Sequence, residues 1–193
     1  MIKLKSLLLE ADWPDMILND RHIWYHGRTV DNETFSLDYV GGEKANDQEG
    51  PGFYFTNSLG NARSYAYPNG IVLKCKIDYK KLIIKGDVSE TKTSKRILVD
   101  LINSSPDKDS TLENFDENPQ IAMVKAVNSY LRYTDAFDSY QMVARDFYRY
   151  NAKEYLQALS KYYDAQLTKH GNNVYHLIVY KPEIITVIDK IKI

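Results

Sequence analysis

Short apolar segments near both ends of the chain show strand-like spacing, whereas the middle shows helical spacing. The alternation is clearest in residues 71–78, where Ile71, Leu73, Cys75 and Ile77 alternate with Val72, Lys74, Lys76 and Asp78. This period of two predicts a strand that is buried on one face. Further strands are predicted at residues 22–27, 53–56, 82–84, 174–180 and 184–188. A helix is predicted over residues 57–67, with Asn57 or Ser58 as its cap.

Apolar positions recur at helical spacing between about residues 91 and 165. One predicted helix follows a cap near Ser94, and a second begins at Pro119, a residue type favoured in the first turn. The second helix is expected to bury Ile121, Val124, Val127 and Leu131 on one face. Two more helices are predicted after Ser139 and after Asn151, and residues 104–118 are predicted to be a polar loop.

Strands at both ends with helices between them favour an α+β fold over a doubly wound sheet. We expect one domain over residues 21–193 with a helical insertion at about 91–165, preceded by a lead-in at residues 1–20. The lead-in has two open interpretations, a short amphipathic turn or a processed segment. The second rests on Leu8-Leu9-Glu10 before Ala11, which resembles the cleavage site of tailed-phage prohead proteases. Its apolar block is too short for a signal peptide.

Composition narrows the class of protein. The 193 residues are 44% apolar and 26% charged, which is typical of a globular protein. A net charge of −1 excludes a general electrostatic nucleic-acid binder, and the single cysteine, Cys75, excludes an internal disulfide. No apolar run approaches the roughly 20 residues of a membrane span, so no membrane partner is expected. Eight of the 16 tyrosines lie between residues 130 and 163, where helical spacing predicts a packing seam.

Two short segments carry candidate chemistry. Trp24-Tyr25-His26-Gly27 is the first, and Gly52-Phe53-Tyr54-Phe55-Thr56 is the second, followed by Ala62, Tyr65 and Ala66. A histidine that can hydrogen-bond, an aromatic face that can stack and a glycine that opens the backbone together suit a flat carboxamide ring attached to a sugar. Core packing remains the alternative for each aromatic ring. His22 and His26 have no third ligand in a strand-like segment, so no metal site is expected.

These segments resemble the ADP-ribosyltransferase superfamily, in its diphtheria-toxin and poly(ADP-ribose)-polymerase-like branch. His26 matches the family histidine, Tyr54 the stacking tyrosine, and Tyr65 the second ring with a shift of one residue. The late strand of the family matches the segment from His176 to Glu183. The resemblance covers about 90 residues at the two ends of the chain and none of the central helices.

The resemblance implies two small antiparallel sheets split around a cleft that holds NAD. His26 would bind the adenosine ribose, the Gly27 backbone would pair with the nicotinamide carboxamide, and Tyr54 and Tyr65 would sandwich the nicotinamide ring. The family's catalytic glutamate position is His176 here. An imidazole can accept a hydrogen bond but supplies no negative charge to the oxocarbenium-like sugar of the reaction. The implied catalytic set is therefore His26, Tyr54 and His176, with Glu183 as a weaker substitute carboxylate.

The resulting expectation is an NAD-dependent mono-ADP-ribosyltransferase that modifies a macromolecule, with protein favoured over nucleic acid as the acceptor. The expected setting is the cytoplasm of a bacterial cell, with a phage-encoded effector, packaged in the virion or not, as one form. Two alternatives stay open: a weak or inactive module that binds NAD or ADP-ribose, and a virion-associated structural protein.

Overall fold

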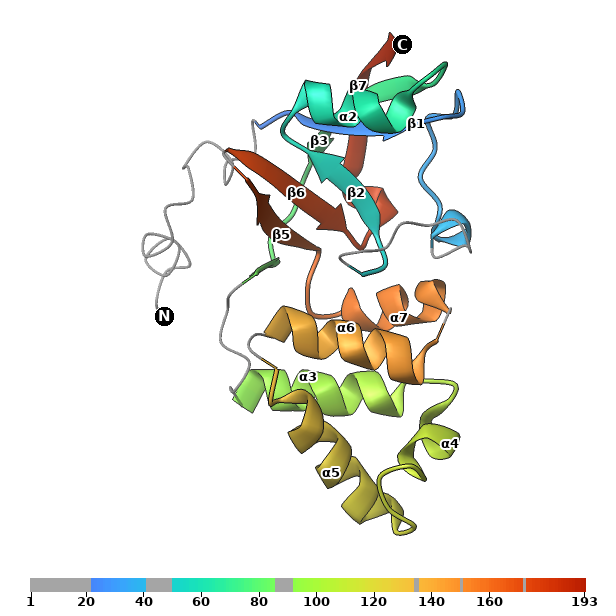
Figure 1. The fold of residues 1–193 in the computed structure, drawn as a ribbon, viewed down its shortest axis with the longest axis vertical. Helices are drawn as coiled ribbons and strands as arrows, with labels where there is room; N and C mark the ends of the chain where they lie inside the picture. The colour runs from blue at the N-terminus through green and yellow to red at the C-terminus, as the bar shows by residue number, and fades with distance from the viewer. Residues whose placement is uncertain (1–21, 41–49, 86–91, 134–135, 150, 172) are drawn as a thin grey trace.

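The chain forms one mixed β-sheet with a helical unit at one side (Figure 1). The computed structural model describes residues 22–40, 50–85, 92–133, 136–149, 151–171 and 173–193. The lead-in over residues 1–20 and its cleavage motif lie outside these residues. None of the helices in the described part combines the length and apolarity needed to cross a bilayer.

The strands lie in the order β4-β5-β6-β2-β1-β3-β7. Their bounds are β1 Trp24–Arg28, β2 Phe53–Thr56, β3 Ile71–Ile77, β4 Leu82–Ile84, β5 Ala165–His170, β6 Val174–Val179 and β7 Ile185–Lys192. β4 pairs with β5 in parallel, and the other neighbours pair antiparallel. The α+β class predicted from the sequence is confirmed. The strands of the described residues form one seven-stranded sheet, where the family resemblance implied two small ones.

The helices divide into one on the sheet and a group inserted between β4 and β5. Their bounds are α2 Leu59–Ala66, α3 Lys92–Asn103, α4 Lys108–Leu112, α5 Pro119–Tyr130, α6 Ala136–Phe147 and α7 Ala152–Leu159, with short 3-10 turns η1 Leu37–Tyr39 and η2 Pro182–Ile184. Side-chain N-caps stand at the beginning of three helices. The Ser58 hydroxyl accepts from the Asn61 N–H, and the Asn118 and Asn151 side chains cap α5 and α7.

Two apolar cores follow from the alternation of side chains along each strand. One face of the sheet buries Trp24, Phe55, Leu73, Leu177 and their neighbours. The opposite face meets the helical unit through Ile83, Ile178 and Tyr180, while α2 covers Val72 with Ala62 and Ala66. Figure 1 shows α2 beside β1 at the top of the view and the helical unit below the strands.

The tyrosine seam predicted for residues 130–163 is largely a packing feature. Tyr130, Tyr140, Tyr148 and Tyr155 are buried within the helical core. Three of these hydroxyls are hydrogen-bonded: Tyr130 donates to the Asp146 carboxylate at 3.1 Å, Tyr148 to the Leu101 carbonyl at 2.6 Å, and Tyr155 to the Tyr140 carbonyl at 3.2 Å. These three rings therefore bury apolar area while their polar ends keep a partner.

One expectation about elements is wrong, one is half right, and one strand was not predicted. Residues 108–112 form α4 within the predicted polar loop, and residues 165–170 form the unpredicted strand β5. The predicted face of α5 is half right: Val127 and Leu131 are buried as expected, whereas Ile121 and Val124 are 48% and 59% exposed. The helix buries Ala122 and Ala126 in place of these two residues. Alanine leaves room for close helix packing, so the small residues face the core in place of the larger ones.

Candidate functional site

Three adjacent strands carry the residues that the sequence singled out. His26 lies on β1, Tyr54 on β2 and His176 on β6, and the sheet order places β6, β2 and β1 next to one another. Tyr25 pairs with Thr56, and Thr56 pairs with His176. Residues separated by up to 150 positions in the chain are thus brought to one part of the sheet.

A hydrogen bond joins His26 to the strand that carries Tyr54. The Nδ1 atom of His26 lies 2.6 Å from the backbone oxygen of Tyr54. A carbonyl oxygen can only accept, so Nδ1 must carry the proton and donate it. The neutral ring therefore presents Nε2 as an acceptor, and this hydrogen bond fixes both its tautomer and its orientation.

The surroundings of His26 keep its ring neutral. Its pKa is lowered to about 4, first by burial and second by the positive charge of Arg28, against the opposing effect of the Tyr54 backbone hydrogen bond. Phe35 and Phe55 pack on the imidazole with ring centroids 5.2 Å and 5.3 Å away. At neutral pH the ring can accept a hydrogen bond from a hydroxyl but carries no charge.

The imidazole of His26 and the phenol of Tyr54 lie on opposite faces of the sheet. The His26 ring contacts Phe35 and Phe55, which belong to the core containing Trp24. The Tyr54 ring packs against the helical core, and its hydroxyl donates to the Gly50 carbonyl at 2.5 Å. The structure therefore joins the two residues through the backbone and does not place their rings in one crevice.

Gly27 and Tyr65 lie close together because α2 packs tightly on β1. A Cβ on Gly27 would lie 3.0 Å from the Cβ of Tyr65 and 1.9 Å from the carbonyl oxygen of Ala62. The Tyr65 side chain is 54% exposed. The predicted stacking ring is thus accessible at the surface, whereas the backbone of Gly27 lies beneath a helix.

His176 lies on the same face of the sheet as Tyr54, two pairs along β6. Its ring stacks on His170 of β5, with centroids 4.1 Å apart and an angle of 24° between the planes. Thr56 and Thr168 flank it as its partners on the neighbouring strands. The position thus belongs to a polar row across β2, β6 and β5. Glu183 lies in η2, beyond the end of β6.

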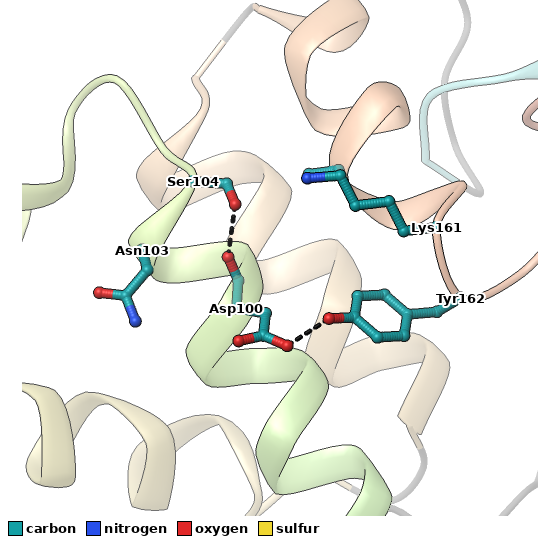
Figure 2. Close-up of a pocket in the computed structure, with 6 residues that line it drawn as sticks. Asp100, Asn103, Ser104, Lys161 and Tyr162 are labelled. Atoms are coloured by element: carbon teal, nitrogen blue, oxygen red, sulfur yellow. Dashed lines mark hydrogen bonds between the residues drawn. The ribbon is translucent and has the colours of Figure 1, made fainter.

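Two surface pockets lie in the helical unit, away from these strands. One, of about 220 Å³, lies between the end of α3 and the segment after α7, and its polar lining consists of Asp100, Asn103, Ser104, Lys161 and Tyr162 (Figure 2). The Tyr162 hydroxyl donates to the Asp100 carboxylate, as the close-up shows. The second, of about 420 Å³, has Phe115, Tyr130, Arg145 and Arg149 among its lining residues. Neither pocket contains a residue that the sequence had singled out for NAD.

Sequence reasoning missed the contacts around His26 that come from residues 28–36. Arg28 donates through Nη1 to the backbone oxygens of Asn32 and Thr34 at 2.7 Å and 3.1 Å. Its guanidinium lies 4.5 Å from the centre of the Phe35 ring. Periodicity carries no signal for such contacts, because they involve carbonyl groups of an irregular segment.

Across the described ranges, no three histidine, cysteine, aspartate or glutamate residues come together in a way that could hold a metal ion. Comparison with known protein families, with curated proteins and with solved structures finds no match.

Proposed function

We propose that this chain binds NAD beside β1 and β2 and transfers its ADP-ribose to a macromolecule. The observation that carries the proposal is the 2.6 Å contact between His26 Nδ1 and the Tyr54 backbone oxygen. This contact links the two segments that resemble ADP-ribosyltransferases and leaves an imidazole acceptor suited to a ribose hydroxyl.

The position of His26 near the end of β1 supports a ligand that reaches both faces of the sheet. β1 ends at Arg28, two residues beyond His26. A dinucleotide lying across this strand end would meet the imidazole on one face and the exposed Tyr65 ring on the other. The family resemblance implies a ligand held between two small sheets, whereas this proposal places the ligand at the strand end of one continuous sheet.

The chemistry proposed is cleavage of the bond between nicotinamide and ribose. The electrons of this bond leave with nicotinamide, and a nucleophile of the acceptor forms the new bond to the ribose carbon while losing its proton. A carboxylate would stabilise the positive charge that develops on the sugar. His176 stands where the family has that carboxylate, so turnover is expected to be slow. An intracellular bacterial setting, with a phage origin, belongs to the same proposal.

The stacking of His176 on His170 favours one alternative, a module that binds NAD or ADP-ribose without turnover. A stacked pair of imidazoles offers hydrogen-bonding capacity but no negative charge at neutral pH. Binding and chemistry therefore have to be measured separately.

The test combines two measurements on the purified full chain. Calorimetry with NAD measures binding, and labelled NAD added with bacterial lysate measures transfer. We compare the wild type with His26→Ala and Tyr65→Ala, and with Tyr39→Ala as a control that removes an exposed tyrosine in η1. Binding and labelling lost in the first two variants and kept in the control support the proposal. Binding without labelling selects the module, and absence of NAD binding by the wild type overturns both.

A further inference from the structure

Residues 29–36, here called the strap, fold back over the face of β1 that carries His26. Within the strap, the Asn32 side chain accepts from the Thr34 N–H at 2.8 Å and from the Thr34 hydroxyl at 2.7 Å. The Asn32 N–H also donates to the Val30 carbonyl at 3.0 Å. These local bonds form a turn that directs the following residue, Phe35, toward the sheet.

Arg28 holds this turn from the inside. Its Nη1 donates to the Asn32 and Thr34 carbonyls, so one guanidinium engages two backbone oxygens of the strap. The same group lies over the Phe35 ring at 4.5 Å, an arrangement in which the positive charge is attracted by the ring face. A planar guanidinium can make these contacts at once, whereas a lysine ammonium cannot.

Lys190 of β7 holds the strap from the outside. Its Nζ lies 2.9 Å from an Asp31 carboxylate oxygen and 2.7 Å from a Glu33 carboxylate oxygen. The strap is therefore anchored to two different strands, by Arg28 of β1 on one side and by Lys190 on the other.

Phe35 connects the anchored strap to the imidazole of His26. Its ring lies 5.2 Å from that of His26 at an angle of 65°, and 5.4 Å from that of Phe53. The imidazole is thus fixed on one side by the Tyr54 carbonyl and on another by the Phe35 ring. The charged group that acts on the imidazole is Arg28 on its own strand. Arg28 in turn interacts with Cys75 of β3, while Asp31 and Glu33 of the strap are paired with Lys190 of β7.

We infer that Arg28 is the positioning residue of His26, acting through the strap and Phe35 to hold the imidazole with Nε2 ready to accept from a ligand hydroxyl. The identity of the ligand, NAD, rests on the proposed function. The positioning itself does not, because it concerns contacts within the chain. Arg28 is accordingly expected to affect ligand affinity through His26 without touching the reacting atoms.

The experiment measures the chemical accessibility of His26 first, with no ligand present. Diethyl pyrocarbonate modifies imidazoles, and mass spectrometry of peptides reports the rate for each histidine. We expect Arg28→Lys and Phe35→Ala to raise the rate at His26 about tenfold, the change produced by a loss of roughly 1.4 kcal/mol of local stability. Lys190→Met is expected to raise it less, since it removes only the outer anchor.

Lys74→Met is the matched control, because Lys74 makes a similar ion pair at 2.8 Å with Asp189 that does not involve the strap. The rate at His170, which lies far along the sheet on β5, serves as the internal reference in every variant. A folded Arg28→Lys protein in which His26 reacts at the wild-type rate overturns the inference. Phe35→Ala decides the question in the same way if Arg28→Lys does not fold.

A second measurement connects the positioning to the ligand. Where the wild type turns over NAD, Arg28→Lys should raise KM about tenfold with a much smaller change in kcat, since a weakened hydroxyl contact is lost from the ground state and the transition state alike. Equal KM values with increased His26 accessibility would contradict the step from positioning to binding. If the wild type does not bind NAD, the proposed function fails, and the modification rates still decide the role of Arg28.

Discussion

Gly27 of β1 lies directly beneath Ala62 of α2, and a Cβ on Gly27 would sit 1.9 Å from the Ala62 carbonyl oxygen. Ala62 itself is fully buried against the sheet. The glycine that the sequence marked as an opening for a ligand is thus, in this structure, the contact that lets α2 reach β1.

Gly27→Ala is expected to destabilise the protein by about 3 kcal/mol, because α2 must move away from β1 to admit the methyl group. Gly60→Ala is the control within the same helix. Its added Cβ meets only the Ser58 hydroxyl, at 3.9 Å. The substitution should therefore stabilise α2 by about 0.5–1 kcal/mol, because alanine loses less conformational entropy than glycine on folding. Urea unfolding followed by circular dichroism measures both changes. Equal midpoints for Gly27→Ala and the wild type would show that the contact is looser than described.

Acidification should destabilise the protein through His26. The unfolded chain takes up this proton near pH 6.5, whereas the folded chain does so only at about pH 4. Between these values the unfolded state binds more protons, so stability falls as the pH is lowered and is fully present above about 6.5. His26→Gln keeps an N–H donor for the Tyr54 carbonyl and cannot be protonated in this range. Thermal melts of the variant should depend less on pH over this window, and a slope equal to that of the wild type would refute the assignment.

Asp164 should contribute strongly to stability. Its carboxylate accepts from the backbone N–H groups of Lys80 and Lys81 at 2.8 Å and 2.9 Å, and from Lys181 Nζ at 2.5 Å. Burial opposes the charged form, yet these donors leave the pKa of Asp164 below its usual value. Its stabilisation is therefore present above about pH 3.8 and is lost as the pH falls through the lowered pKa.

Asp164→Asn is expected to lower the free energy of unfolding by about 1–3 kcal/mol, since the Lys181 ammonium loses its counter-charge at a largely buried position. Asp189→Asn provides the comparison, because Asp189 pairs with Lys74 at an exposed position where ion pairs contribute little. Denaturant titrations at neutral pH separate the two cases. Similar losses for both variants would mean that burial of Asp164 adds nothing.

His176→Glu tests the chemistry of the proposed site. If NAD binds beside β6, a carboxylate there should stabilise the developing sugar cation and raise nicotinamide release by about a hundredfold. His170→Glu places the same charge on the partner of the stacked pair and should not raise it. The rates are measured by chromatography of released nicotinamide. An unchanged rate in a folded His176→Glu protein would remove this strand from the proposed site.

The sequence was most informative where side chains alternate or repeat with one period. β2, β3 and β4 and the caps at Ser58 and Asn151 were predictable because each depends on residues within a few positions. β5 was not, since Gln166 and Thr168 are polar yet buried. The hydroxyl of Tyr180 donates to Gln166, a tertiary contact that hydrophobic patterning does not register.

The candidate site shows the same limit. The pattern predicted a strand for His26 and another for Tyr54, but that the two strands are adjacent, and which face each side chain occupies, depends on strand pairing and register. In the observed pairing, Tyr25 is the partner of Thr56. Because side chains alternate, that register places the odd positions of β1 with the even positions of β2. A shift of one residue in this pairing would change whether His26 and Tyr54 lie on the same face of the sheet. No property of either residue alone determines this register.

The short pairing of β4 with β5 gives the helical unit a degree of independence from the rest of the sheet. The chain leaves the sheet after Ile84 and re-enters it at Ala165, the partner of Leu82 on the strand directly alongside. Parallel strands place the exit and the entry at opposite ends of this pairing, but β4 has only 3 residues, so the two points stay close. The pairing from β6 to β7 involves no residue of the intervening helices. Evolution or a protein engineer can replace everything between these two points with a different module, larger or smaller, provided that the substitute shields Ile83, Ile178 and Tyr180 from water.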